Sequence, residues 1–290
     1  MPDPIVYLNG QFLPQSQAML PINDRGTQFG DGVYDVVRYF AHQPFAMQAH
    51  QDRLARSLRQ IHLDPLPCFD ALPKLSAQLL EHNGLSDAIV YWQITRSPAQ
   101  ANRDRLYPET LQHHVLLTAT LARSLAQEQT ACPATCCLHP DQRWARCDIK
   151  TLNLLPSVLA KNHAHRLGYD DALLHRGNTI TEATAANLFL IAGDTLQTHP
   201  CNHHILPGIN RQVVIDLAHS LKLNLEETSF SIAALLQADG AFLTGTTTLL
   251  RPISTIDSTF FPTDHPILSR LRQALLAHIA DKTKLPPSSV

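Results

Sequence analysis

Lys150 is the residue whose type and surroundings point most directly to chemistry. It lies between Ile149 and Leu152, where an expected strand gives way to a helix that begins near Leu154. We expect such a lysine to be partly buried, and burial disfavours the charged form of an amine. A neutral amine can attack a carbonyl carbon and hold it as a Schiff base. The more common alternative is a lysine whose methylene chain packs while its ammonium group reaches solvent.

Two segments could hold a phosphate group. Residues 208–210 (Gly-Ile-Asn) open a predicted helix, and the first N–H groups of a helix lack internal partners and attract an anion. Residues 244–248 (Thr-Gly-Thr-Thr-Thr) add hydroxyl groups and a glycine that permits close backbone approach. Arg53, on another predicted helix, could supply a positive charge. Taken singly, each feature is more often an ordinary cap, turn or solvated helix face.

Glu182 is the third candidate, because it stands among small residues just before the apolar run 188–190. A carboxylate there could face a flat heterocycle and keep its ring nitrogen protonated. A lysine, a phosphate cradle and a ring-facing carboxylate are together what pyridoxal 5'-phosphate requires for covalent capture, anchoring and a cationic electron sink. The combination is more specific than any of its parts.

Composition restricts the classes of partner. The chain has 290 residues, of which 44% are hydrophobic and 17% charged, and its formal net charge is −2. Two domains are expected at this length, and no basic surface for a nucleic acid or a membrane is indicated. Small-molecule partners are therefore expected. Neither a signal peptide nor an apolar run of ~18 residues is visible, which predicts a cytoplasmic location.

The cysteines and histidines predict neither a disulfide framework nor a metal site. Six cysteines, including the adjacent pair Cys136 and Cys137, are expected to be reduced thiols. The 16 histidines include neighbours such as His203 and His204, but no H-E-x-x-H or paired C-x-x-C motif occurs. No metal is expected.

Turn signals outnumber alternating β-α units, which favours an α+β fold over a doubly wound one. Asn9-Gly10 predicts a hairpin, and residues 33–40 and 45–47 are expected to form a second strand pair. The polar stretch 123–130 is the predicted linker between a small N-terminal α+β domain (1–122) and a larger domain (131–290). Further helices are predicted over 54–61, 73–83, 154–167, 209–221 and 266–280, strands over 88–95 and 114–120, and a functional loop over 96–112.

Several segments together resemble a known family. Residues 24–37 (DRGTQFGDGVYDVV), 143–155 around Lys150, 158–161, 181–182 and 206–209 are similar to fold type IV pyridoxal-phosphate enzymes, and most similar to bacterial D-amino-acid aminotransferases. The resemblance covers nearly the whole chain. It implies a small α+β domain, a larger domain with a pseudobarrel, a cofactor between them and an active homodimer.

The resemblance also implies roles for individual residues. Lys150 would form the internal aldimine and move a proton, Glu182 would pair with the pyridine nitrogen, and Arg53 would bind the phosphate. Tyr34 would line the substrate side, while Leu206 would pack against the ring. The phosphate cup would be completed by Ile209, Asn210, Thr246 and Thr247.

One loop departs from the family pattern. D-amino-acid aminotransferases have an arginine and, two residues later, a histidine that receive the substrate α-carboxylate, whereas this chain has Arg103-Asp104-Arg105. Arg103 retains the first role, because a guanidinium grips a carboxylate with two hydrogen bonds. Arg105 stands where the family has the histidine. As an extra cation it could favour dicarboxylate substrates, or Asp104 could neutralise its charge. The simpler alternative is that the loop is solvated and Arg105 contacts no substrate.

The sequence predicts a transaminase that moves an amino group from a D-amino acid to a 2-oxo acid, with 2-oxoglutarate as the expected acceptor, in a ping-pong reaction. An aminodeoxychorismate lyase and a branched-chain or amine transaminase are alternatives of the same fold, which Lys150 and Glu182 cannot distinguish. A binding or regulatory protein without catalysis is a third class, and the intact Lys150 argues against it.

Overall fold

The computed structural model describes residues 3–97 and 103–285, which form two compact units. The first unit contains residues 3–124 without 98–102, together with Ile149–Asn153 and Lys282–Leu285. The second unit contains Leu125–Asp148 and Leu154–Asp281. The chain therefore returns to the first unit for five residues around Lys150 before it continues into the second.

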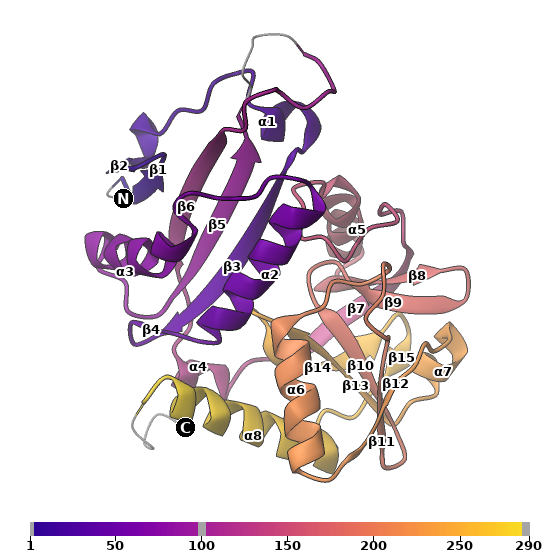
Figure 1. Cartoon of the computed structure of the whole chain (residues 1–290). Helices are drawn as coiled ribbons and strands as arrows, with labels where there is room; N and C mark the ends of the chain where they lie inside the picture. Colours follow the sequence, from indigo (N-terminus) through magenta and orange to yellow (C-terminus); the bar gives the residue numbers. More distant parts are fainter. Residues whose placement is uncertain (1–2, 98–102, 286–290) are drawn as a thin grey trace. The chain divides into compact units, whose positions relative to one another are not determined.

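An antiparallel sheet is the centre of the first unit (Figure 1). Within the described residues its strand order is β2-β1-β6-β5-β3-β4. Asn9 and Gly10 both have positive φ angles, of 49° and 98°, and form the turn between β1 and β2. This hairpin confirms the prediction from the Asn-Gly pair. The strands are β1 (Ile5–Leu8), β2 (Gln11–Pro14), β3 (Gly32–Phe40), β4 (Gln43–Pro44), β5 (Ala88–Arg96) and β6 (His113–Leu121).

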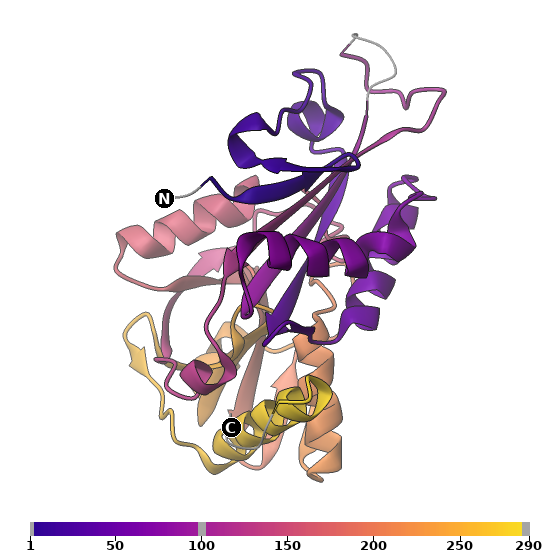
Figure 2. The ribbon, with the colours of Figure 1, turned by 90° about the vertical axis from the view of Figure 1, so that its left-hand side faces the viewer.

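Two helices cover this sheet. Helix α2 (Met47–Gln60) packs against β3, and α3 (Leu72–Asn83) packs against β1 and β6 (Figures 1 and 2). Helix α3 ends at Gly84, whose φ of 62° is the left-handed conformation that glycine adopts without strain. The short helix α1 (Arg25–Phe29) precedes β3. The core between helices and sheet contains Val33, Val37, Leu54, Leu58, Leu79, Val90, Trp92 and Ile94.

The segment Ile149–Asn153 pairs with the start of β3, whose other end pairs with β4. Tyr34 N donates to Lys150 O at 3.0 Å, and Leu152 N donates to Gly32 O at 3.2 Å. Thr151 forms an antiparallel bridge with Val33, and Ile149 is buried in the core of the first unit. Lys150 is consequently fixed by backbone hydrogen bonds to a strand more than 100 residues earlier.

A larger sheet organises the second unit. Among the described residues its main path is β12-β11-β10-β13-β14-β7-β8-β9, with β15 paired to β14. The β8-β9, β10-β11 and β13-β14 neighbours are antiparallel, whereas β7 pairs in parallel with both β8 and β14. The strands are β7 (Ala134–Pro140), β8 (Asp171–Arg176), β9 (Thr179–Ala183), β10 (Asn187–Ala192), β11 (Thr195–Thr198), β12 (Asn224–Glu227), β13 (Gly240–Gly245), β14 (Leu249–Ile256) and β15 (Thr259–Phe260).

The second sheet curls so that β9, at the end of its path, also lies beside β10. Its concave core contains Leu173, Ile180, Leu188, Leu243 and Ile253. Helix α5 covers β7 and β8, and α6 packs on β12 and β13 (Figure 1). The helices of this unit are α4 (Leu125–Glu128), α5 (Leu155–Arg166), α6 (Ile209–Ser220), α7 (Ile232–Leu236) and α8 (Pro266–Lys282). The α+β class and the barrel-like second sheet are confirmed.

Two sequence predictions about local structure are wrong. Residues 45–47 are not a strand, because β4 is limited to Gln43–Pro44 and α2 already begins at Met47. The segment before Lys150 is irregular, and only Thr151 forms an isolated bridge. At Thr151 a tertiary contact, rather than local periodicity, decides the backbone conformation.

The predicted linker 123–130 contains α4, in which Leu125 and Glu128 are buried. The proposed domain limits, 1–122 and 131–290, stay a prediction. Part of the predicted loop 96–112, namely residues 98–102, lies outside the described residues. No helix in the described ranges is long and apolar enough to cross a bilayer.

Candidate functional site

In the first unit Lys150 and Tyr34 are in contact. The Lys150 Nζ atom lies 4.3 Å from the centroid of the Tyr34 ring, an arrangement that stabilises an ammonium group over an aromatic face. The Lys150 backbone is held by β3, and its N–H also lies 3.4 Å from Ser57 Oγ on α2. The half-buried amine is thus presented from a fixed backbone, as a nucleophile requires.

Arg53 is fixed by a carboxylate in the interior of the first unit. Its Nε and Nη2 atoms each donate to Asp35 at 2.8 Å, and His50 Nδ1 lies 2.7 Å from Asp35 Oδ1. His50 and Arg53 are three residues apart on α2 and therefore face the same way. Asp35 is completely buried on β3. Its pairing with Arg53 orients the guanidinium group.

The ionisation of this cluster follows from burial and pairing. Burial alone would raise the pKa of Asp35, but the charge and hydrogen bonds of Arg53 outweigh burial and hold that pKa well below its ordinary value. Burial lowers the pKa of His50, more than the Asp35 carboxylate raises it. The cluster is therefore an Asp35–Arg53 ion pair with a neutral imidazole beside it.

The arginine loop is anchored through its backbone. Arg25 Nη1 donates to Asp104 O at 2.6 Å, Nη2 donates to Arg105 O at 3.3 Å, and Nε pairs with Asp31 at 2.8 Å. The Arg103 guanidinium lies 5.1 Å from the Phe29 ring centroid. The side chains of Arg103 and Arg105 are both exposed. Arg25 was not predicted from the sequence as a site residue, although it holds the loop that carries the two predicted ones.

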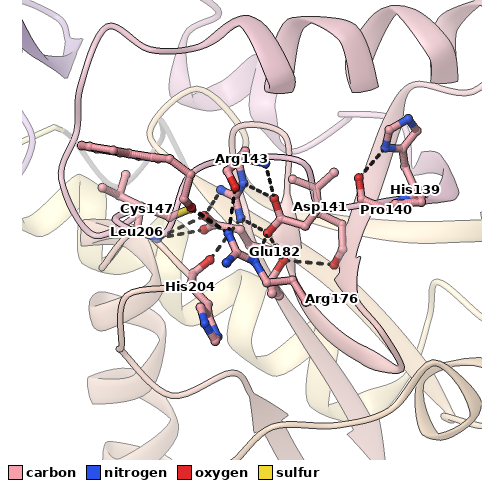
Figure 3. Close-up of polar contacts among 12 residues, drawn as sticks. His139, Pro140, Asp141, Arg143, Cys147, Arg176, Glu182, His204 and Leu206 are labelled. Carbon is pink, nitrogen blue, oxygen red and sulfur yellow. Dashed lines mark hydrogen bonds and ion pairs between the residues drawn. The ribbon is translucent and has the colours of Figure 1, made fainter. Parts of the chain in front are cut away.

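Glu182 is buried on β9 of the second unit, where three donors surround it. Asn187 Nδ2 donates at 2.8 Å. Leu206 N donates to both carboxylate oxygens at 3.1 and 3.2 Å, and Arg143 Nη1 forms an ion pair (Figure 3). Burial raises the pKa of Glu182, and the Arg143 charge offsets this effect only in part. A carboxylate offers about four lone-pair positions. Leu206 N divides its contact between both oxygens, so a further N–H group could take the place of one of these two contacts.

Arg143 is itself held by a second buried carboxylate, Asp141. Asp141 accepts from Arg143 Nε and Nη2, both at 2.9 Å, and from Arg176 Nε at 3.1 Å (Figure 3). Burial alone would raise the pKa of Asp141, but the hydrogen bonds and charge of Arg143 hold it at about 2. The sequence prediction missed Asp141, Arg143 and Asn187. Charged residues close to apolar strands were the available signal, but sequence spacing does not reveal their pairing.

The predicted phosphate-binding residues of the second unit are brought together. Asn210 Nδ2 donates to Gly245 O at 2.8 Å, which ties the start of α6 to the turn 246–248 that contains Thr246 and Thr247. Gly208, the N-cap of α6, has no side chain to accept hydrogen bonds from the first-turn amides. A Cβ atom at Gly208 would lie 2.0 Å from Asn187 Oδ1. Glycine therefore lets the helix start approach the residue that also binds Glu182.

The described residues thus divide into two sets. The first unit supplies Lys150 beside Tyr34, Arg53 on the helix that contacts Lys150, and the anchored loop with Arg103 and Arg105. The second unit supplies the Glu182 carboxylate and the uncapped start of α6, with Ile209, Asn210, Thr246, Thr247 and the Leu206 backbone around them. The chemistry of the second set suits a planar ring with an N–H group and an attached anion. No group of three or more potential metal ligands occurs among the described residues.

Comparison with known proteins gives matches over most of the chain. The model of the amino-transferase class IV family matches residues 32–256. A D-alanine aminotransferase of Listeria monocytogenes is 38% identical over 254 residues, which is 87% of each chain. A D-alanine aminotransferase of Staphylococcus aureus is 34% identical over 252 residues, covering 87% of this chain and 89% of the other.

Solved structures share the fold at lower sequence identity. The branched-chain amino acid aminotransferase of Escherichia coli superposes with a TM-score of 0.87 at 23% identity and covers 97% of this chain and 96% of that one. The branched-chain aminotransferase of the archaeon Thermoproteus uzoniensis gives a TM-score of 0.85 at 24% identity, over 99% of this chain and 97% of that one.

The buried His50 should make the stability of the first unit sensitive to acid. Its folded-state pKa is lowered, so the unfolded chain binds a proton more readily, and the free energy of unfolding should fall as pH drops below about 6.5. One such group contributes a slope of up to ~1.4 kcal/mol per pH unit. His50→Gln, which keeps an N–H donor for Asp35, should flatten urea-unfolding free energies between pH 5 and 7.

The control for this experiment is His42→Gln, which alters an exposed histidine of the same unit. It should leave the wild-type pH dependence in place. An unchanged slope in His50→Gln would show that His50 does not take up the proton.

Proposed function

The chain belongs to the class IV aminotransferase family, and we propose that it is a pyridoxal 5'-phosphate-dependent transaminase that moves the amino group of a D-amino acid to a 2-oxo acid. The expected acceptor is 2-oxoglutarate. The cofactor supplies a carbonyl for covalent attachment and a ring that accepts electrons from the substrate Cα.

The observation that carries this proposal is the link through Asn187 in the second unit. Asn187 Nδ2 donates to Glu182, while its Oδ1 packs where Gly208 has no side chain. A carboxylate suited to a ring N–H group and a helix start suited to a phosphate are therefore neighbours. A single ligand that carries both a ring N–H group and a phosphate would use both of these neighbouring features.

The chain's own residues would act as follows. Lys150 Nζ would attach the cofactor and then carry the proton that leaves and returns to the substrate Cα, with the Tyr34 ring beside it. Glu182 would accept the ring N–H group. Arg53, oriented by Asp35, would bind the phosphate together with Ile209, Asn210, Thr246 and Thr247, and Leu206 would pack against the ring.

The D-amino-acid assignment rests on the curated relatives. D-alanine aminotransferases are 34–38% identical to this chain over most of its length, whereas the branched-chain aminotransferase structures cited above are 23–24% identical and support the fold. The comparisons therefore favour the D-amino-acid reaction over the branched-chain, amine-transaminase and lyase alternatives. The cytoplasmic location stays a prediction.

Lys150→Ala should abolish transamination between D-alanine and 2-oxoglutarate, because the variant lacks the amine that attaches the cofactor and moves the proton. Borohydride reduction of the wild-type protein with cofactor, followed by peptide mapping, should place the label on Lys150. Lys161 is the matched control, since it pairs with Asp171 at 2.9 Å in the second unit. Wild-type labelling in Lys150→Ala, or a label on Lys161, would contradict the assignment.

The two loop arginines should affect substrates differently. Arg103→Ala should raise KM and lower kcat/KM for every amino acid, because all carry an α-carboxylate. Arg105→Ala should lower kcat/KM mainly for D-glutamate and D-aspartate, by about tenfold or more, since only these offer a second anion to a charge-assisted hydrogen bond. Steady-state kinetics with D-alanine and D-glutamate distinguish the two roles. Equal effects below twofold from Arg105→Ala would identify a solvated side chain.

The proposal includes a homodimer as the active form. Helix α5 exposes an apolar stripe, with Leu155 67%, Val158 49% and Leu159 51% accessible. These residues are spaced to share one helix face, and exposed apolar stripes commonly mark contacts between protein chains. The double substitution Leu155→Glu with Leu159→Glu should convert the dimer to a monomer in sedimentation velocity. Phe260→Glu, at an exposed residue outside α5, should stay dimeric. A dimer that persists in the α5 variant would refute this interface.

A further inference from the structure

Four charged side chains of alternating sign form a chain in the second unit (Figure 3). Arg176 pairs with Asp141 at 3.1 Å, Asp141 pairs with Arg143 at 2.9 Å, and Arg143 pairs with Glu182. The side chain of Asp141 is fully buried, and those of Glu182 and Arg143 are 5% and 12% accessible. Their formal charges cancel. Arg143 is the member that contacts both carboxylates.

The Arg143 guanidinium group is held on all sides. Its Nε and Nη2 atoms donate to Asp141, Nη2 also donates to His204 O at 3.1 Å, and Nη1 points to Glu182. Asp141 additionally accepts from the Arg143 backbone N–H at 3.0 Å and from Thr181 Oγ1 at 3.1 Å. The guanidinium group is planar and rigid. The hydrogen bonds from its Nε and Nη2 atoms to Asp141 therefore also fix the direction of Nη1.

A buried carboxylate without a cation takes up a proton, because burial disfavours its charged form. The Asn187 and Leu206 N–H groups around Glu182 are neutral, so Arg143 is its direct cationic contact among the described residues. Arg143 therefore counteracts the basicity that burial gives Glu182. A proton shared by two bases resides on the stronger base. Because a cation beside Glu182 weakens the carboxylate as a base, it favours the proton on a heterocyclic nitrogen bound to Glu182.

We infer that Arg143, positioned by Asp141, keeps Glu182 ionised, so that the proton between Glu182 and a bound heterocyclic nitrogen resides on the nitrogen. No bond to carbon and no oxidation state would change: the ring nitrogen would hold its own proton as a cationic N–H group and donate a hydrogen bond to the Glu182 carboxylate. Arg143 and Asp141 are positioning residues in this scheme. This role rests on the proposed cofactor, and it names the residues that control protonation of the cofactor's ring nitrogen.

The test uses protein reconstituted with pyridoxal phosphate labelled with nitrogen-15 in the ring, whose chemical shift reports protonation of that nitrogen. In the wild-type protein the nitrogen should be protonated from pH 6 to 9. Arg143→Met should lower the ratio of protonated to unprotonated nitrogen at least tenfold, and Arg143→Gln should do the same if the methionine variant folds poorly. Arg143→Lys, which keeps a cation, should restore most of the wild-type signal.

Arg176→Met is the matched control, because Arg176 contacts Asp141 but belongs to the far end of the chain from Glu182. It should change the nitrogen ratio by less than twofold. A nitrogen signal in Arg143→Met and Arg143→Gln that equals the wild type would overturn the inference. An equal shift in Arg176→Met would also overturn it, since general loosening of the network would then explain the effect.

A second measurement needs no cofactor. Infrared difference spectra of the apoprotein, assigned with Glu182→Gln, should show a carboxylate at residue 182 at pH 7 in the wild type and a protonated carboxyl group in Arg143→Met. A carboxylate in both proteins would count against the inference. Failure of the proposed function looks different, because the wild-type protein would then not attach the labelled cofactor to Lys150.

Discussion

The pairing of residues 150–152 with the start of β3 is the constraint on which the arrangement of the first unit's reactive groups depends. Two backbone hydrogen bonds and the Thr151–Val33 bridge hold an otherwise irregular segment in place. The same strand carries Tyr34 toward Lys150 and Asp35 toward α2. Two neighbouring residues of one strand thus contact the amine and orient the arginine.

Buried carboxylates fix the orientation of arginines in both units. Asp35 holds Arg53 in the first unit, and Asp141 holds Arg143 in the second. Removing such charges from water is costly, and the pairing repays this cost only with good geometry. The observed two-point hydrogen bonds provide that geometry. In each case the main effect of the pairing is to orient a guanidinium group rather than to stabilise the fold. An oriented guanidinium group is suited to binding planar or anionic groups.

Glycine and asparagine contribute to the second unit through close approach. Gly208 begins α6 without a side-chain cap, and its missing Cβ leaves space for Asn187. Asn187 then reaches Glu182 and Leu206 O with one amide nitrogen. A helix start that can bind an anion and a carboxylate that can bind an N–H group are thereby kept at a constant separation, as recognition of one ligand requires.

The sequence by itself determined the elements with strong local signals, the α+β class, and the residue types of the candidate site. The Asn9-Gly10 hairpin, the end of α3 at Gly84 and the start of α6 after Gly208 follow from local backbone preferences. Lys150, Glu182 and Arg53 were identified by their chemistry and by the family resemblance. Only the tertiary structure decided that β3 holds Lys150, that Asp35 orients Arg53, and that Asp141 and Arg143 stand behind Glu182. Those contacts join residues far apart in the chain, and no local period or turn signal encodes which buried charges will meet.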